Sequence, residues 1–314
     1  MRINFIMMAA AAALVMTGCK SEPAFEQTEE VGPYTVTLIE KNVWHVEDCN
    51  SENPAGQGPR ADGTYGNNNC SDMYIVRGKD KALLIDLSNN IKWAENADQA
   101  LRDIFYQRAG DRQKLITITH NHGDHTGMLY AFKDEQDVTF LLPENDFSKD
   151  KAFPEGRKSL IGDLATIDLG GGMVIECVET PGHTPGSIVF FIKGHDIAFS
   201  GDAIGSGGGV WIFSLEGFKQ YTVGVPRLIS YINDPANKIE QQKLTFYGGH
   251  DWQKKDMPRL DMQYLLDMQT LCELICKGEA EPEAYANPML DSNFKYGSAT
   301  ITWRKSAYEQ LLSE

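Results

Sequence analysis

The chain has 314 residues, 42% of them hydrophobic, and a formal net charge of -15 at pH 7. This composition is that of an ordinary globular protein with a sizeable hydrophobic core. The acidic balance argues against nucleic acid as a partner, because binding to phosphates requires a basic surface. A nuclease is therefore not expected, and the partner implied by the motifs further along the chain is a small-molecule substrate.

The N-terminal segment has the features of an export signal. Arg2 supplies a positive charge, residues 5–16 form an apolar run, and the small residues Thr17 and Gly18 precede Cys19. This ending resembles a bacterial lipobox, in which the cysteine becomes the lipidated N-terminus after cleavage. Cleavage nearby as an ordinary secretory peptide is the alternative, and export is expected in both cases.

These features predict how the chain is divided. Residues 1–18 are expected to be a lipoprotein signal peptide, and residues 19–32, rich in glutamate, a solvated acidic tether. Residues 33–314 are expected to form one folded domain, since α/β domains commonly reach this length. The mature protein is expected to be anchored to a bacterial membrane through the lipid on Cys19, on the periplasmic side or at the cell surface.

Beyond residue 33, apolar runs of strand length alternate with longer amphipathic patterns. Strands are expected at 34–39, 43–46, 73–76, 82–86, 115–118, 138–142, 164–169, 172–178, 187–192, 196–199, 243–247 and 299–303. Helices are expected at 91–108, 127–132, 218–232 and 259–276, and at the C-terminus. Two strand-rich blocks, each followed by helices, predict an α/β protein with two sheets packed face to face and helices outside. The broad apolar face of the 259–276 helix fits either the core or a subunit interface, so the oligomeric state stays open.

The densest group of metal-binding side chains directly follows the 115–118 strand. His120 and His122 are two positions apart, so in an extended segment both imidazoles face the same point. Gly123 is expected to allow a turn, after which Asp124 and His125 can face a second centre nearby. Three imidazoles this close repel one another when protonated, and burial without a metal stabilises none of them. The segment therefore predicts half of a metal site rather than a solvated polar loop.

Three further turns each present one residue of metal-binding type at the end of a strand-like run. Glycine and proline surround His183, and glycine precedes both Asp202 and His250. Each turn alone is weak support, since a single turn histidine is usually a surface residue. Together with the first cluster they place all but two of the 7 histidines in one kind of setting. The other two, His45 and His195, are interpreted as structural.

The cysteines indicate packing and stability rather than catalysis. Cys49 and Cys70 flank a polar loop, and in an oxidising compartment a disulfide between them is plausible. Cys272 and Cys276 lie on one face of a predicted helix, which indicates core packing more than a bridge. None of the cysteines has the spacing of a zinc finger.

Taken in chain order, the metal-type residues resemble the pattern of the metallo-β-lactamase-fold hydrolases. In that family a His-x-His-x-Asp-His loop is followed by a His, an Asp and a His, here matched by His120, His122, Asp124, His125, His183, Asp202 and His250. The family also places a buried Asp at a strand end, where it supports a metal ligand, and Asp86 is at that place. The resemblance implies a four-layer αββα sandwich. The full set with a bridging Asp is more similar to glyoxalase II and the lactonases than to the true β-lactamases.

The resemblance also implies which residues hold which ion. His120, His122 and His183 would hold a first metal, Asp124, His125 and His250 a second, and Asp202 would bridge the two. Imidazole and carboxylate ligands without thiolate suit two zinc ions, with manganese or iron as alternatives.

Two such ions about 3.5–4 Å apart can lower the pKa of a shared water towards about 7 and polarise a carbonyl group. The expected activity is therefore binuclear metal-dependent hydrolysis, in which metal-bound hydroxide attacks an ester-like carbonyl of a lactone, a thioester or a β-lactam. Asp124 is the candidate catalytic residue, as a proton relay. The alternatives are a phosphodiesterase on the same fold and a surface lipoprotein that binds a ligand through the metals without turnover.

Two segments are expected to wall the substrate pocket, the 49–70 loop and residues 205–213. The aromatic side chains of the second segment, with Tyr221, would offer an apolar face to a substrate, with plain core packing as the alternative. Tyr221 and Tyr247 are candidate donors to the substrate carbonyl.

Overall fold

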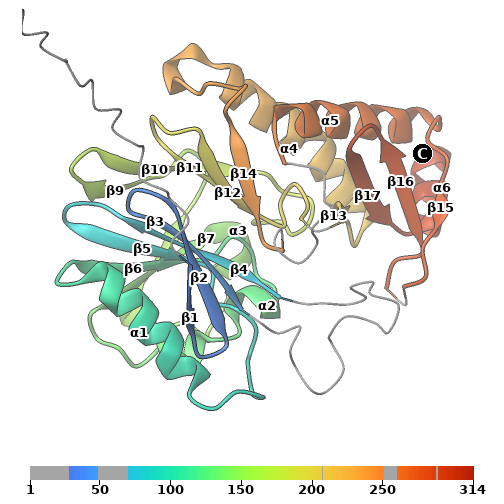
Figure 1. The fold of residues 1–314 in the computed structure, drawn as a ribbon. Helices are drawn as coiled ribbons and strands as arrows, with labels where there is room; N and C mark the ends of the chain where they lie inside the picture. Colours follow the sequence, from blue (N-terminus) through green and yellow to red (C-terminus); the bar gives the residue numbers. More distant parts are fainter. Residues whose placement is uncertain (1–27, 49–69, 207, 251–259, 288) are drawn as a thin grey trace, which may run out of the picture.

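The computed structural model describes residues 28–48, 70–206, 208–250, 260–287 and 289–314, and Figure 1 shows how their elements are arranged. The predicted signal peptide and most of the predicted tether lie outside these residues. The predicted disulfide and nearly all of the 49–70 loop also lie outside them, because Cys49 does. Among the described residues, no helix is both long enough and apolar enough to cross a bilayer.

The first sheet contains eight strands in the order in which they follow one another in the chain. They are β1 (Thr28–Val31), β2 (Tyr34–Glu40), β3 (Val43–Asp48), β4 (Asp72–Arg77), β5 (Lys81–Ile85), β6 (Gln113–Thr117), β7 (Val138–Pro143) and β8 (Lys158–Ile161). Neighbours from β1 to β5 are antiparallel, whereas β5 to β8 are parallel. The connections between the parallel strands contain α1 (Ala97–Ala109), α2 (Gly123–Thr126), η2 (Leu129–Ala131), α3 (Glu144–Phe147) and η3 (Glu155–Arg157).

The second sheet has five strands. Their spatial order is β14 (Thr245–Gly248), β12 (Ile197–Gly201), β11 (Ile188–Ile192), β10 (Met173–Glu179) and β9 (Thr166–Gly170). Strands β12 and β14 pair in parallel, and the other neighbours are antiparallel. Between β12 and β14 the chain forms helix α4 (Leu215–Asn233) and the turn η4 (Pro235–Asn237).

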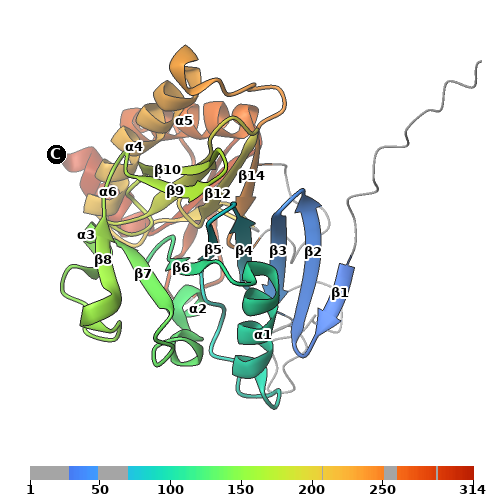
Figure 2. The same cartoon turned by 90° about the vertical axis from the view of Figure 1, so that its left-hand side faces the viewer.

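Alternate residues of each sheet pack into different cores, which explains the layering. Leu83 of β5 and Phe190 of β11 pack between the two sheets. Their neighbours point outward: Leu84 packs in the core with α1, and Phe191 packs in the core with α4 and α5 (Met262–Lys277). Figure 2 shows α1 on the outer face of the first sheet, with α4 and α5 beyond the second. The arrangement confirms the predicted αββα sandwich.

A third, smaller sheet near the C-terminus was not predicted as a unit. Its order is β13 (Val210–Trp211), β17 (Ala299–Trp303), β16 (Ser292–Tyr296) and β15 (Glu283–Ala284), and helix α6 (Lys305–Ser313) follows β17. Phe294, Ile301 and Trp303 of this sheet share a core with Leu265 and Met268 of α5. The apolar face of α5 is therefore mainly core, which was one of the two alternatives for it.

Several boundaries differ from those predicted. Residues Thr28–Val31, expected in the tether, form β1 at the edge of the first sheet. The helix predicted at 91–108 begins only at Ala97, because Asn96 has a left-handed backbone with φ 57°. The strand at Lys158–Ile161 was not expected at all.

The helix predicted at 127–132 is shorter than expected and is a 3-10 turn. Its first backbone donors are used elsewhere: the N–H of Gly127 donates to the carbonyl of Ser88, and that of Met128 to the carbonyl of Leu87. A Cβ atom on Gly127 would lie 2.2 Å from the nitrogen of Asn90, so the chain approaches the 87–90 segment more closely than any other residue type allows.

Candidate metal centre

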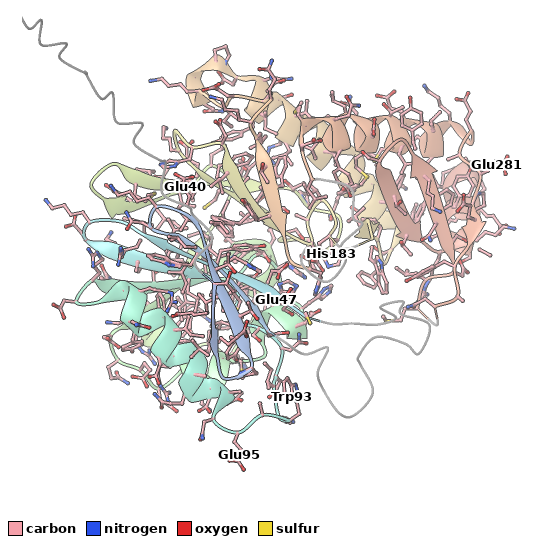
Figure 3. The ribbon with its side chains drawn as sticks, viewed as in Figure 1. Glu40, Glu47, Trp93, Glu95, His183 and Glu281 are labelled. Atoms are coloured by element: carbon pink, nitrogen blue, oxygen red, sulfur yellow. The ribbon has the colours of Figure 1, made fainter. Side chains whose placement is uncertain are left out.

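The metal-type residues meet at one end of the sandwich, where strands of both sheets finish. All seven come from four connections: His120, His122, Asp124 and His125 after β6, His183 between β10 and β11, Asp202 after β12, and His250 after β14. In Figure 3, His183 lies near the centre of the view, between the two halves of the molecule. The loops of the two sheets are joined there by a hydrogen bond from the N–H of Ile188 to the carbonyl of Thr119, 3.0 Å long.

Three imidazole nitrogens converge on one point and form what we term the first trio: His120, His122 and His183. The distance from His120 Nε2 to His122 Nδ1 is 3.0 Å, and His183 Nε2 lies 3.2 Å and 3.0 Å from these two atoms. His120 and His183 are buried and His122 is partly exposed. His120 and His122 therefore face one point, as predicted from their spacing in the sequence.

A second trio, Asp124, His125 and His250, lies beside the first. His250 Nε2 is 3.5 Å from Asp124 Oδ2. One ligand atom from each of Asp124, His125 and His250 lies within 4.8 Å of the other two. Asp202 stands between the trios: its Oδ2 is 3.6 Å from His183 Nε2, 3.8 Å from His125 Nε2 and 3.4 Å from His250 Nε2. One carboxylate oxygen is therefore within reach of donors from both groups.

The ring nitrogen that faces away from the centre is fixed in four of the five histidines. His183 Nδ1 donates to the carbonyl of Trp211 at 2.8 Å, and His250 Nδ1 to that of Cys70 at 2.5 Å. His125 Nδ1 donates to Asp86 Oδ2 at 2.9 Å. His120 Nδ1 lies 3.0 Å from the hydroxyl of Thr119. Such contacts fix the orientation of each ring and, in a neutral imidazole, leave the inward nitrogen with its lone pair.

Asp86 directly follows β5 and connects the end of this strand to the histidines. It is buried and has φ 67°, and its Oδ1 accepts from the N–H of Thr119 at 2.6 Å. Its Oδ2 accepts from the Thr119 hydroxyl at 2.8 Å, so that hydroxyl is free to accept from His120. Asp86 thus orients His120 through Thr119 and orients His125 directly, which is one histidine of each trio. This is the supporting role that the family resemblance implied for it.

The two trios have opposite electrostatics. Burial lowers the pKa of His120 well below its usual range, lowers that of His122, and lowers that of His183 to about 4, so these imidazoles are neutral at pH 7. For His125, burial acts downward but the charge of Asp86 outweighs it and raises the pKa to about 9. For His250, burial is likewise outweighed, by Asp202 and Asp124, and the pKa lies well above its usual range.

The donor set fits divalent cations. In a tetrahedral site with Zn–N distances of about 2.1 Å, nitrogens are separated by about 3.4 Å, close to the spacing in the first trio. Three lone pairs facing one another would repel without a positive charge between them. In the second trio, the buried His125 Nε2 has no hydrogen-bond partner among the described residues. Imidazole and carboxylate donors of this kind are ligands for zinc, manganese or iron.

Gly123 does not have the role predicted for it. It is the first residue of α2, its φ lies outside the left-handed region, and a Cβ atom there would meet nothing within 4 Å. The glycine with a steric role is Gly249, where a Cβ atom would lie 2.5 Å from Asp202 Oδ1 and 2.6 Å from His125 Cε1. The close approach of β14 to the centre therefore depends on Gly249.

The two histidines interpreted as structural lie outside the centre. His45 is buried in β3 and its Nε2 is 2.7 Å from Asp72 Oδ1. His195 lies in the turn between β11 and β12, and its Nδ1 donates to Glu40 Oε1 at 2.6 Å. Neither residue belongs to either trio.

The aromatic residues predicted to face the substrate, either as apolar surface or as donors to its carbonyl, lie in two different settings. Phe213 is 36% exposed, and its ring centre lies 5.6 Å and 5.5 Å from those of His122 and His183. With His122, His183 and Pro185 it lines a pocket of about 310 Å³. Tyr221 is instead fully buried in the core beside Gly182, and Tyr247 packs against Tyr74 between the sheets. Phe213 therefore faces the pocket, and core packing is correct for Tyr221.

Sequence reasoning missed the groups that act through the backbone. The carbonyls of Cys70 and Trp211 orient His250 and His183, and no side-chain pattern predicts a carbonyl contact between distant segments. Thr119 was the exception that a pattern could have found, because it immediately precedes His120 and a hydroxyl there can reach an adjacent imidazole.

The chain is similar to known hydrolases in sequence and to a known metallo-beta-lactamase in fold. The chain is 27% identical over 244 residues to an atrochrysone carboxyl ACP thioesterase of Aspergillus fumigatus, in an alignment that covers 69% of this chain and 51% of that protein. It is 34% identical over 98 residues to a hydroxyacylglutathione hydrolase of a Chelativorans species, over 31% of this chain and 36% of that one. The chain thus spans about half or less of the length of these curated relatives.

The solved structure of a metallo-beta-lactamase from Pontibacter korlensis has the same fold. It superposes with a TM-score of 0.53 at 21% identity, covering 79% of this chain and 99% of the other. The family model of the metallo-beta-lactamase superfamily matches residues 70–242, which include β4 to α4 and six of the seven residues of the centre. Because this match spans more than half of the chain, the protein belongs to the metallo-beta-lactamase superfamily.

Proposed function

We propose that the protein is a binuclear metal-dependent hydrolase of an ester-like carbonyl compound. The observation that carries the proposal is the pair of donor trios on either side of Asp202, whose Oδ2 lies within 3.8 Å of histidines from both. Two cations held in this way are the arrangement used for hydrolysis of carbonyl and phosphoryl groups.

In this proposal, His120, His122 and His183 hold one ion and Asp124, His125 and His250 hold the other, with Asp202 between them. Zinc is the first choice for both, and manganese or iron is the alternative. Bound divalent ions supply Lewis acidity, which polarises a carbonyl and makes water acidic enough to react near neutral pH.

Asp124 is the residue proposed to move the proton. Burial acts to raise its pKa, but the hydrogen bond to His250 and the charge of His125 outweigh burial and hold the pKa well below its usual range. Its carboxylate is therefore ionised at neutral pH, and the residue is partly exposed. An Asp124 oxygen can accept a proton from the attacking water and return it to the leaving group.

The pocket beside the first trio is the proposed seat for one part of the substrate. Phe213 and Pro185 supply apolar surface there, and Ser214 and Gln220 supply polar groups. Its volume of about 310 Å³ is at the lower end of that of small-molecule sites. One relative is named an ACP thioesterase and another a hydroxyacylglutathione hydrolase, so an S-acyl thiol is the first substrate to test, followed by lactones and β-lactams.

The test is a panel of S-acyl thiols, acyl lactones, cephalosporins and an aryl phosphodiester, assayed with the zinc-loaded protein. We expect turnover of at least one carbonyl substrate that chelation abolishes and zinc restores. His120→Ala should lower that turnover by more than about 100-fold, above the range seen when only a supporting residue is lost. His195→Ala is the matched control, because it removes a histidine remote from the centre, and should leave turnover unchanged.

Two results would contradict the proposal. One is protein that carries no stoichiometric metal after loading, and the other is turnover that survives His120→Ala. Activity confined to the phosphodiester would favour the phosphodiesterase alternative. Tight binding of a carboxylate with no product from any substrate would favour a non-catalytic ligand-binding protein.

A further inference from the structure

Asp146 in α3 contacts both loops that supply the first trio, although it was not singled out in the sequence. Its Oδ2 accepts from the N–H of Asn121 at 2.9 Å and from the hydroxyl of Thr184 at 2.7 Å. Its Oδ1 accepts from the N–H of Gly186 at 2.7 Å. The side-chain amide of Asn121 also donates to the Asp146 carbonyl at 3.4 Å. One carboxylate thus joins segments that belong to different sheets.

These contacts lie immediately next to metal-type residues. Asn121 stands between His120 and His122, and Thr184 follows His183. The fit around the carboxylate is close on the second loop: a Cβ atom on Gly186 would lie 2.6 Å from both the nitrogen and Cγ of Asp146. Thr184 is further fixed by Ser187, whose Oγ accepts from the Thr184 N–H at 3.1 Å. The loop that carries His183 therefore has little freedom to move away from Asp146.

The second trio is oriented by other groups. His125 is bonded to Asp86, and His250 to the carbonyl of Cys70. None of the hydrogen bonds of Asp146 among the described residues involves Asp124, His125 or His250. Loss of Asp146 should therefore act on one side of the centre.

We infer that Asp146 is a positioning residue that holds the loops of His120, His122 and His183 at the spacing that an ion in the first trio requires. Hydrogen bonds to an ionised carboxylate are roughly twice as strong as those between neutral groups. The three donors are also left unsatisfied if the carboxylate is lost, which adds the cost of exposing or misplacing them. The inference rests on the proposed function in assuming that the first trio binds a metal.

The test compares three substitutions. Asp146→Asn removes acceptor capacity with little change in shape. Glu144→Gln makes the same charge change on the same short helix, at an exposed residue. Asp267→Asn disrupts a remote carboxylate with a similar role, because Asp267 Oδ2 accepts from the N–H and hydroxyl of Ser298 at 2.7 Å and 2.8 Å. The last variant separates a general loss of stability from a loss of positioning.

The first readout is competitive zinc titration of metal-free protein, in two backgrounds that each keep one trio. In His250→Ala, which retains the first trio, Asp146→Asn should weaken zinc binding by about 10-fold or more, the usual effect of losing a supporting contact. In His183→Ala, which retains the second, it should leave affinity unchanged. Glu144→Gln and Asp267→Asn should change neither. Equal weakening in both backgrounds, or no weakening in either, would overturn the inference.

The second readout does not depend on metal. In metal-free protein, Asp146→Asn should speed amide hydrogen exchange at Asn121 or at Gly186 by about 10-fold or more, because these amides use different oxygens of the carboxylate and asparagine keeps only one of the two, while Asp267→Asn should not. Unchanged exchange at both amides would overturn the inference. Parent protein that takes up no zinc would instead contradict the proposed function, and the exchange result would still decide whether Asp146 holds the loops.

Discussion

Two glycines in the ligand-bearing turns differ sharply in what surrounds them. A Cβ atom added to Gly249 would collide with Asp202 and His125, whereas one added to Gly123 would meet nothing within 4 Å. Gly249→Ala should therefore displace Asp202 and His125 and cost about 1–3 kcal/mol of stability, as overpacking does. Gly123→Ala should change stability by no more than about 0.5 kcal/mol, as at an exposed site.

Thermal unfolding and zinc titration of the two variants check this difference. Gly249→Ala is expected to lower both the unfolding temperature and the affinity for the second ion, and Gly123→Ala neither. Similar behaviour of the two variants would mean that close packing at Gly249 has no influence on the centre.

At the residue scale, the sequence was sufficient for side chains whose chemistry is unusual. Histidines and aspartates after apolar strand-like runs identified all the residues that the structure brings into the two trios. It was not sufficient for Asp146 or Tyr221. An aspartate in an acidic segment and a tyrosine in a helix are common, and only the folded chain shows that one joins two loops and the other is buried.

At the scale of elements, the turn between β11 and β12 is tied to the end of β2 by His195 and Glu40. The hydrogen bond to Glu40 raises the pKa of His195 above its usual value. Since the folded pKa exceeds the unfolded one, the pair stabilises the fold fully below about pH 6.5, and this contribution is lost as the pH rises through the folded value.

His195→Gln should therefore destabilise the protein most at acidic pH. The expected loss at pH 6 is at most about 1 kcal/mol, because both side chains are partly exposed and the pair is screened by solvent. Denaturant unfolding at pH 6 and pH 9 measures it, and the difference from the parent should shrink at the higher pH. A destabilisation of the same size at both pH values would show that packing, rather than the ion pair, is responsible.

Long elements were predictable and short ones were not. Strands such as β11 are continuous apolar runs, and α4 and α5 have a strong helical pattern, so both types are visible in the sequence. Strands β13 and β15 have 2 residues each, which is too short for any period to show. Tertiary hydrogen bonds also shortened the predicted 127–132 helix, and such contacts are set by residues far away in the chain.

At the scale of the whole molecule, the centre lies where the two sheets meet and is complete only when they are docked. The first trio combines residues after β6 of one sheet with His183 from the other. Metal binding should for this reason stabilise the docked arrangement, by an amount set by the ratio of free metal to its Kd. The lipid anchor at Cys19 and export to the membrane stay predictions, because residues 1–27 lie outside those described.

The most direct test of the proposed binuclear centre is an anomalous-difference map from crystals of the zinc-loaded protein, collected at the zinc absorption edge. We expect two peaks, each about 2.0–2.1 Å from its nitrogen ligands. One should lie among His120, His122 and His183, the other among Asp124, His125 and His250, with Asp202 between them. A single peak, or peaks away from these seven side chains, would contradict the account.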